Sequence, residues 1–368
     1  MKRLQLKKWN YNKKMYNLKE LLLIAFLWIG AALLFVFIKI NDLSEFRLTE
    51  VYQVQHWVST VRIYIIAFLL SGLISIPMGI MHLFVYPAIN KQSFGFILRI
   101  RLLNILLLIV FVSFFYYFFI FNGNLHSFNF SLIMSISVYA VLIESFITII
   151  LLLKRNLGVG FFSDFFKSNY LNPSKEERVF MFLDMIDSTP LIQHLGSYEF
   201  SNLMQDCFAD LSDAVMEYNG IIYQFVGDEA VITWKTKHGF RFSNSLDFYY
   251  SYLCILESKK DYYTQKYGVL PKFRAAVNSG EVTIALVGDI KREIAYYGNV
   301  LNTCSRIQKL SDNGQNQIII SESFFKHVQY SDNYSFLALT DLKLKGIPDI
   351  KTAYVVKPIR TNFNRSVL

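Results

Sequence analysis

Cysteine, proline and charge are all scarce in this chain of 368 residues. The chain contains 3 cysteines and 7 prolines, and charged residues make up 18% of it. Because the cysteines lie far apart and follow no metal-ligand spacing, neither a zinc site nor a disulfide framework is predicted. Charge is missing above all from four long stretches of the first 153 residues, so this half does not have the composition of a soluble protein.

The four long apolar stretches predict a bundle of four transmembrane helices. Each stretch is near or above the roughly 18 residues that a helix needs to cross a bilayer. They run over residues 21–38, 63–89, 102–121 and 130–153. Within them, His82 and Glu144 are the side chains that can carry charge near neutral pH. Either residue could mark a ligand or proton site, or could simply hydrogen-bond to a serine, a tyrosine or the backbone.

Basic residues gather on one side of the predicted membrane segment. Residues 1–19 hold seven Lys or Arg and no acid, three more basic residues lie within 90–101, and two follow the fourth stretch at 154–155. Since basic loops stay on the cytoplasmic side, both termini are predicted to be cytoplasmic and the helices to cross the inner (plasma) membrane. The net charge of +9 therefore indicates a partner in the lipid bilayer and not in nucleic acid.

The change in composition along the chain predicts five segments. Residues 1–19 form a basic cytoplasmic N-terminus, and residues 20–155 form the transmembrane domain. A linker rich in glycine and charge covers 156–177, a catalytic domain covers 178–357, and a tail covers 358–368. The linker contains four phenylalanines at spacings compatible with a short amphipathic helix, although a simple spacer is an equal alternative.

The third quarter of the chain begins an alternation of strands and helices. Strands are predicted over 178–183, 221–226, 230–234, 272–278, 282–287, 317–320, 336–344 and 352–356. Helices are predicted near the cap residues 188–189 and over 200–218, 247–267 and 300–310. This order favours an α+β domain with helices on one side of a mainly antiparallel sheet.

Two carboxylates stand where predicted strands end. Asp184 opens the segment Asp184-Met-Ile-Asp-Ser-Thr189, and Asp228 lies in the hairpin turn Gly227-Asp228-Glu229. Carboxylates on neighbouring strand ends can share a pair of divalent cations, as phosphoryl-transfer chemistry on a nucleotide requires. The alternative is that Asp184 caps a helix and Asp228 fills a turn. Nearby, Asp187 is interpreted as a turn residue or as a group that supports the metal ligands, and Glu229 as a neighbour that points away.

A third motif, Tyr297-Gly-Asn-Val-Leu-Asn-Thr-Cys-Ser-Arg306, places an amide and a guanidinium on one helical face, at Asn302 and Arg306. Together with the two carboxylates it resembles the class III nucleotidyl cyclases, over about residues 176 to 357. The resemblance implies a ferredoxin-like βαββαβ core. It also implies a homodimer with shared active sites, in which the metal-binding acids come from one protomer and the Asn/Arg pair from the other.

The resemblance also implies a metal site. In that family an Asp at the end of the first strand and an Asp in the first hairpin bind two Mg²⁺ ions. The matching residues here are Asp184 and Asp228, with the backbone carbonyl of Met185 beside them. One ion activates the ribose 3′-hydroxyl and the other neutralises the triphosphate as pyrophosphate leaves; Mn²⁺ is a possible substitute.

The remaining family positions concern the nucleotide itself. The resemblance implies that Asn302 positions the ribose, that Arg306 stabilises charge on the reacting phosphate, and that Lys345 binds the terminal phosphates. Arg306 and Lys345 could instead be ordinary surface groups. The positions that read the base hold Gln224 and Ala295, where adenylyl cyclases usually have Lys and Asp.

Taken together, the motifs predict a membrane-bound cyclase that converts a nucleoside triphosphate to the 3′,5′-cyclic nucleotide and pyrophosphate. ATP is the expected substrate. Because the Gln224 amide both donates and accepts hydrogen bonds, GTP or a pyrimidine nucleotide remains an alternative. A catalytically silent nucleotide-binding membrane receptor is a further alternative.

Overall fold

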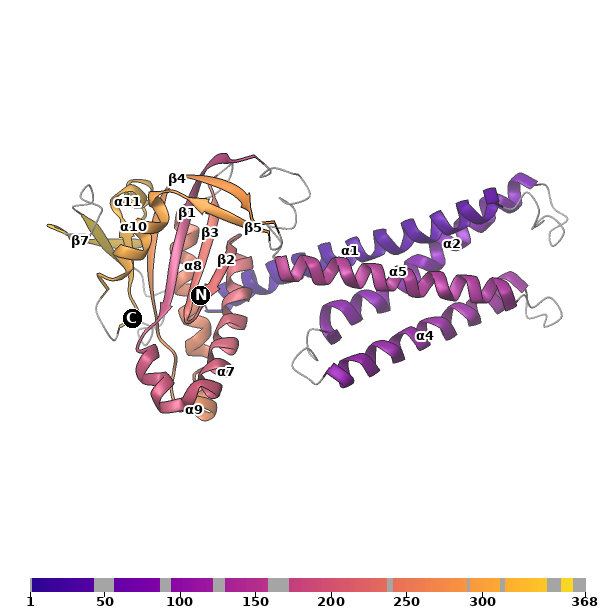
Figure 1. The fold of residues 1–368 in the computed structure, drawn as a ribbon, viewed down its shortest axis with the longest axis horizontal. Coiled ribbons are helices and arrows are strands. Elements are labelled where there is room, and N and C mark those ends of the chain that lie inside the picture. Colours follow the sequence, from indigo (N-terminus) through magenta and orange to yellow (C-terminus); the bar gives the residue numbers. More distant parts are fainter. Residues whose placement is uncertain are drawn as a thin grey trace. The chain divides into compact units, whose positions relative to one another are not determined.

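The computed structural model describes most of the chain in two compact units. One unit is Lys14–Asn156, and the other comprises Met1–Lys13 and Leu157–Leu368 (Figure 1). The described residues are 2–42, 56–86, 94–121, 130–157, 172–236, 241–289, 292–311, 315–342 and 352–359. The predicted linker therefore lies largely outside them, as does Lys345.

The first unit is built from long helices at the four apolar stretches. The helices are α1 (Lys2–Asp42), α2 (His56–Ile80), the π-helix η2 (Met81–Val85), α4 (Phe94–Phe121) and α5 (Phe130–Leu157). In the described part of the chain, three helices are long and apolar enough to cross a membrane: Asn17–Ile38, Val61–Val85 and Met134–Lys154. The predicted stretch 102–121 lies in α4, a helix of 28 residues that this count of three does not include.

Side chains of α1, α2, α4 and α5 share one small core. It consists of Ile24, Trp28, Ile74, Met78, Leu108, Ala140, Ile147 and Leu151. Large apolar side chains such as Phe26 and Leu142 point outward and are more than 60% exposed. Apolar residues all around a helix fit a lipid surrounding, because hydrocarbon solvates them as well as a protein core does.

The second unit combines one sheet with two layers of helices. Its elements in chain order are β1 (Ser174–Met185), α7 (Ser188–Glu217), β2 (Ile221–Val226), β3 (Glu229–Lys235), α8 (Ser243–Ser258), α9 (Lys260–Tyr267), β4 (Phe273–Val287), β5 (Glu293–Tyr297), α10 (Asn299–Gln308), β6 (Ile318–Ser321), α11 (Glu322–Val328), β7 (Tyr334–Leu339) and β8 (Ala353–Pro358).

The strand order of the sheet is β2-β3-β1-β4-β6-β8-β7, and β5 pairs with β4 outside this path. The pairs are antiparallel except β4 with β6. The elements β1 to β4 follow the βαββαβ order that the sequence predicts, with β1 and β4 in the middle of the sheet. The central position of β1 matters for the site, because its last residues reach the edge where the β2–β3 hairpin turns.

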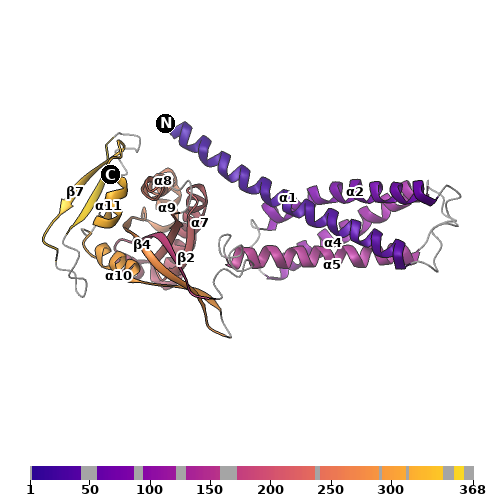
Figure 2. The ribbon, with the colours of Figure 1, turned by 90° about the horizontal axis from the view of Figure 1, so that it is seen from above.

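Helices cover both faces of the sheet, which corrects the prediction of helices on one side. Alternate residues of β1 such as Met181 and Leu183 pack with α7, α8, α9 and α11. Phe180 and Phe182 point the other way and pack with α10. Figure 2 shows α7, α8 and α9 grouped along one side of the strands. The sequence pattern of buried strands, apolar on both faces, already requires a second covering layer.

Several predicted boundaries differ from the structure. The strands predicted over 272–278 and 282–287 form the single strand β4, because it pairs first with β1 and then with β5. The helix predicted over 247–267 is divided at Lys259 into α8 and α9. The sequence reading missed β5 and α11. Within α7, Gly196 adopts a non-helical conformation with φ 77° and separates two helical segments.

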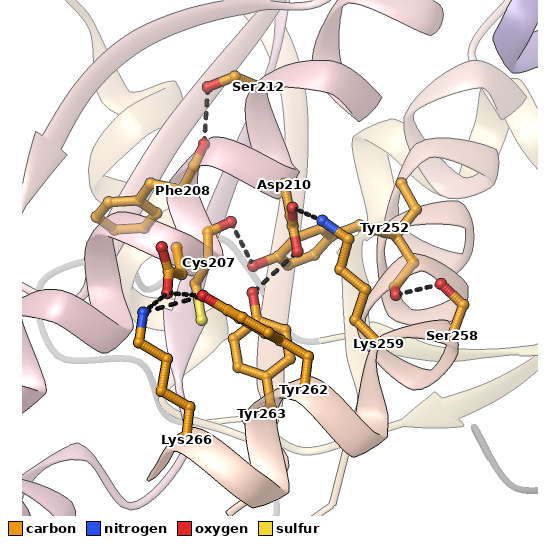
Figure 3. Close-up of polar contacts among 12 residues, drawn as sticks. Cys207, Phe208, Asp210, Ser212, Tyr252, Ser258, Lys259, Tyr262, Tyr263 and Lys266 are labelled. Carbon is orange, nitrogen blue, oxygen red and sulfur yellow. Dashed lines mark hydrogen bonds and ion pairs between the residues drawn. The ribbon is translucent and has the colours of Figure 1, made fainter. Parts of the chain in front are cut away.

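Buried polar contacts join α7 to α9 behind the sheet (Figure 3). Asp210 of α7 accepts hydrogen bonds from Lys259 Nζ at 2.5 Å and from Tyr263 Oη at 2.9 Å. Burial is the main cause that raises the pKa of the Tyr263 phenol, so it remains a hydrogen-bond donor at neutral pH. These contacts fix the helical layer that supports β1.

Candidate active site

The carboxylates Asp184 and Asp228 come together at one edge of the sheet. Asp184 lies at the end of β1, where it pairs across the sheet with Glu229, the first residue of β3. Asp228 occupies the turn before Glu229, after Gly227 with its left-handed φ of 63°. Burial raises the pKa of Asp184, and the charge and hydrogen bond of Asp228 raise it further. The two carboxylates therefore act on each other directly.

A guanidinium that the sequence reading missed also reaches this pair. Arg274 of β4 lies opposite Asp184 in the sheet register. Its Nε and Nη2 atoms donate to Oδ2 of Asp184 at 2.9 and 2.7 Å. This contact lowers the pKa of Asp184 and offsets part of the effect of burial. The pairing depends on the alignment of β4 with β1, which no local motif encodes.

Glu229 belongs to the same acidic group, which corrects the interpretation that it points away. It pairs with Asp184, so both side chains lie on the face of the sheet that α10 covers. Burial is the main cause that raises the pKa of Glu229, the nearby Gln308 amide lowers it, and the charges of Asp184 and Asp228 raise it. Glu229 therefore lies between the acids at the strand ends and Gln308 of α10.

The donor set at the strand ends fits a hard divalent cation. Carboxylate and carbonyl oxygens are the ligands that Mg²⁺ prefers, and a cation, Arg274, already binds Oδ2 of Asp184. The Met185 side chain is buried in the core on the opposite face. In the described segments, no group of three or more His, Cys, Asp or Glu side chains is arranged to hold a metal ion. A bound ion would therefore need backbone or substrate oxygens besides the carboxylates.

Helix α10 carries the predicted Asn/Arg pair on its outer side. Thr303, Cys304, Ile307 and Gln308 are buried against the sheet. Asn302 is exposed, and Arg306 follows one turn later on the same side. The Nη1 atom of Arg306 is buried and has no hydrogen-bond partner in the described chain. The Asn302 amide is thus accessible, and the half-buried Arg306 guanidinium has a hydrogen-bond donor that the described chain leaves unused.

Two buried polar contacts set the position of α10. Asn278 of β4 donates from Nδ2 to the Val300 carbonyl at 3.0 Å, at the start of the helix. The Cys304 thiol donates to the Ala276 carbonyl at 3.1 Å. Before the helix, Gly298 has φ 150°, and a Cβ there would meet the Glu281 carbonyl at 3.3 Å. Glycine is needed at this position because the backbone approaches β4 closely.

The two predicted base-reading residues lie in different surroundings. Gln224 is exposed on β2 and pairs with Val231, so it shares the face of Asp184. Ala295 pairs with Ala285 in the middle of β5. By strand alternation, Ala295 points away from the face that its neighbour Ile294 packs against. The described chain does not bring these two side chains to one face, and Lys345 lies outside the described residues.

Comparison with known proteins gives one family for the second unit. Residues 172–358 match the family described as adenylate and guanylate cyclase catalytic domain. The chain is 30% identical over 196 residues to Adenylate cyclase 2 of Rhizobium meliloti (strain 1021). That alignment covers 53% of this chain and 54% of the relative, so the chain matches about half the length of this curated relative.

Solved structures resemble the same region at low sequence identity. The structure of a bacterial light-regulated adenylyl cyclase aligns with a TM-score of 0.51 at 16% identity, over 64% of this chain and 67% of that one. The adenylyl cyclase CyaB from P. aeruginosa aligns with a TM-score of 0.45 at 19% identity, over 52% of this chain and 98% of that one.

Proposed function

This chain belongs to the family of adenylate and guanylate cyclase catalytic domains, a class III nucleotidyl cyclase, and on that premise we propose that it converts ATP to 3′,5′-cyclic AMP and pyrophosphate at the membrane. The observation that carries the proposal is that Asp184 and Asp228 lie close together at the end of β1, on the face that α10 covers. An acidic group of this kind next to a helix with an amide and a guanidinium suits phosphoryl transfer.

The proposed roles follow from the chemistry of each side chain. Asp184, Asp228 and the Met185 carbonyl would hold two Mg²⁺ ions. When bound, such ions activate an attacking hydroxyl and neutralise phosphate charge. Asn302 orients the ribose by hydrogen bonds. Arg306 stabilises negative charge that develops on the reacting phosphate, which a fixed guanidinium does without reorganising.

The proposed enzyme is a homodimer with two shared sites. Two observations support this assembly. Asn302 is exposed, and the buried Nη1 atom of Arg306 has no hydrogen-bond partner within the described chain. A buried guanidinium nitrogen without a partner is costly, so a phosphate group held by a second copy would stabilise it. Lys345 is proposed to bind the terminal phosphates from its loop.

Adenine is the proposed base, and the support for it is the relative named Adenylate cyclase 2 at 30% identity. Gln224 is exposed and uncharged in the position where a charged residue selects the base in the family. An amide can pair with adenine, with guanine or with a pyrimidine. GTP and the pyrimidine nucleotides are therefore the second candidates, on the observation of Gln224 itself.

The membrane half is proposed to span the inner membrane four times, with the N-terminus and the catalytic domain in the cytoplasm. Four helices contribute to its core, and α4 is as long as α5. The basic residues of positions 1–19, 90–101 and 154–155 would all lie on the cytoplasmic side.

One experiment tests the activity and the base together. The purified full-length protein is incubated with Mg²⁺ or Mn²⁺ and each of ATP, GTP, UTP and CTP, and the products are identified by mass. We expect cyclic AMP as the main product. A different cyclic nucleotide would move the assignment to that base. No cyclic product from a folded, dimeric sample that still binds nucleotide would favour the silent receptor instead.

A further inference from the structure

Two ionisable side chains of the membrane half, which no sequence motif connects, form a buried pair. The Nε2 atom of His82 lies 2.8 Å from Oε1 of Glu144, and both side chains are 4% exposed. They are 62 residues apart and come from η2 and α5. An ionisable pair in this position is costly to bury, so its presence in an apolar bundle points to a use beyond packing.

A third charge lies close to this pair. The Tyr86 ring meets the His82 ring edge-on, with centroids 5.1 Å apart. The Arg101 guanidinium of α4 lies 5.2 Å from the centroid of the same Tyr86 ring. Asn104 of α4 donates to Tyr86 Oη at 2.9 Å and holds the ring in place. The charged groups described near His82 therefore include Glu144 from α5 and Arg101 from α4.

This arrangement allows two protonation states of similar net charge. With His82 protonated, the imidazolium and the Glu144 carboxylate cancel, and Arg101 leaves a charge of +1. When the imidazolium releases its proton to water, the Glu144 and Arg101 charges balance. Both states lie within one charge of neutrality, whereas the pair without Arg101 would become an isolated buried anion on deprotonation.

The surroundings of the pair also contain polar atoms without fixed partners. In the described chain, Oε2 of Glu144 and Nε1 of Trp28 are buried and make no hydrogen bond. An ion pair between Glu20 and Lys154 joins α1 to α5 and sets a common level. At the rise per residue of an α-helix, Trp28 lies about 12 Å along α1 from Glu20, and Glu144 lies about 15 Å along α5 from Lys154. A free acceptor and a free donor thus lie at similar depth in the bundle.

His82 lies in a part of the backbone that has a second hydrogen-bonding pattern available. The π-helix Met81–Val85 is closed by the Tyr86 N–H, which donates to the Met81 carbonyl. Pro77 lies one turn before it in α2 and removes one backbone donor there. A π-turn can convert to an α-turn, which rotates the residues that follow, and such turns are frequent at functional sites.

We propose that His82 and Glu144 form a proton-binding site within the membrane half, and that its occupancy controls the cytosolic active site. The ligand is the proton, exchanged with water at the imidazole. Gain or loss of that proton changes the hydrogen bond between η2 and α5. Helix α5 ends at Leu157, and the chain then leads to β1, which carries Asp184. The control of activity, although not the proton site itself, rests on the proposed cyclase function.

The site can be tested without any enzyme assay. The full chain is placed in phosphatidylcholine vesicles, and infrared difference spectra are recorded as the pH is stepped, with the protein labelled at histidine. Because the chain has 6 histidines, the signal of His82 is the difference between the spectra of wild type and His82→Gln. We expect this difference to titrate with pH together with a carboxyl band that is absent in Glu144→Gln. Spectra that titrate identically in wild type and variants would overturn the proposal.

The matched control is Tyr139→Phe, which removes a hydrogen bond of 2.9 Å from α5 to the Ala31 carbonyl of α1 but no charge. It should leave the titration unchanged. If a single variant does not fold, the double variant His82→Gln/Glu144→Gln is used in its place, because it removes both charges at similar side-chain volume. A histidine and carboxyl titration of the same amplitude in the double variant as in wild type would also contradict the site.

The control of activity is measured in the same vesicles. We expect the pH profile of cyclic nucleotide formation to shift by at least about one pH unit in His82→Gln and Glu144→Gln, and not in Tyr139→Phe. A titrating site with identical pH profiles in all variants would refute the coupling. If no nucleoside triphosphate is cyclised while the histidine still titrates, the proposed function fails and the proton site stands.

Discussion

Asp184 shows how strongly the surroundings of one residue set its chemistry. The same carboxylate is half-buried, lies next to the charge of Asp228 and accepts two hydrogen bonds from Arg274. Burial and Asp228 favour its protonated form, whereas Arg274 favours the charged form that a divalent ion requires. In the proposed metal site, the balance among these groups, and not the identity of Asp184 alone, would decide how well a cation binds.

Replacement of Asp184 by Asn should abolish activity with little loss of fold. The change removes a proposed metal ligand while it keeps the size of the side chain, and we expect cyclase activity to fall by about 100-fold or more. The control is Asp187→Asn, because Asp187 is exposed three residues later with φ 56°, a conformation that Asn tolerates. Equal losses in the two variants would argue against a metal role for Asp184.

Replacement of Arg274 by Gln should lower stability mainly in the absence of divalent ions. The Asp184 carboxylate then loses its partner at 2.7 Å, and we expect the free energy of unfolding to fall by about 1–2 kcal/mol. Added Mn²⁺ should recover more stability in the variant than in wild type. Thermal unfolding with and without Mn²⁺ measures this, with Lys175→Gln, an exposed ion pair, as the control.

The raised pKa of Asp184 predicts the pH dependence of metal binding. Its pKa is above the ordinary 3.8, mainly because of burial. Between the unfolded-state and the folded-state pKa, Asp184 is protonated in the folded protein but not in the unfolded chain. The stability of the metal-free fold therefore increases as the pH falls through the folded-state pKa. Divalent ions need the deprotonated form, so Mn²⁺ affinity should decline over the same range. Calorimetric Mn²⁺ affinities that stay constant down to the ordinary pKa of Asp would contradict this.

At the scale of elements, the position of β1 depends on the helices behind it. Asp206 of α7 is 8% exposed and accepts hydrogen bonds from three side chains of α9. The donors are Tyr262 Oη at 2.7 Å, Lys266 Nζ at 2.8 Å and Tyr267 Oη at 2.6 Å. Burial is the first cause that raises the pKa of Tyr267 to about 12, so the phenol keeps its proton at neutral pH. These bonds join α9 to α7 in the layer that Figure 3 shows.

Truncation of Asp206 to Ala should destabilise the second unit substantially. Three donors lose their acceptor in a buried place, and we expect a loss of about 2–4 kcal/mol in the free energy of unfolding. The control is Glu257→Ala, whose partner Lys260 lies 4.0 Å away on the helix surface, with an expected change within about 0.5 kcal/mol. Denaturant titration of the full chain in detergent measures both. A loss as small as that of the control would mean that α7 and α9 are held by their apolar contacts alone.

At the scale of the whole molecule, the distribution of functional groups favours two copies. Asp184 and Asp228 lie at the strand ends, while Asn302 and Arg306 lie on the outer side of α10. In the proposed dimer, each site takes its acids from one chain and its Asn/Arg pair from the other. Two exposed apolar residues of the hairpin, Phe225 at 45% and Val226 at 53%, are available to such an interface.

Complementation between inactive variants tests the shared site. Asp184→Asn and Arg306→Ala should each be inactive, but their heterodimer contains one intact site. Because half of the dimers formed from equal amounts are mixed, and each has one of two sites, co-expression should restore about a quarter of wild-type activity. Co-expression of Asp184→Asn with Asp228→Asn, which damages the same half-site, is the control and should stay inactive. No recovery in the first pair would contradict sites shared between chains.

The sequence could predict the features that depend on local pattern. The apolar stretches, the strand β2 at residues 221–226, the hairpin turn at Asp228 and the helical spacing of Asn302 and Arg306 are all encoded within a few residues. The motifs were also sufficient to identify the cyclase family, which the match over residues 172–358 confirms. Short-range periodicity and turn chemistry determine such features, because the backbone conformations involved depend on neighbouring residues.

Contacts between distant segments required the tertiary structure. The pairing of Asp184 with Arg274 spans 90 residues, and that of His82 with Glu144 spans 62. The placement of Glu229 beside the acids, and of α10 on this face of the sheet, likewise depends on strand register and layer packing. The sequence by itself determined the family of this protein and supplied the candidate site residues. Only the tertiary structure decided which of them meet, because register and helix packing are set by the fit of the whole core and not by local propensity.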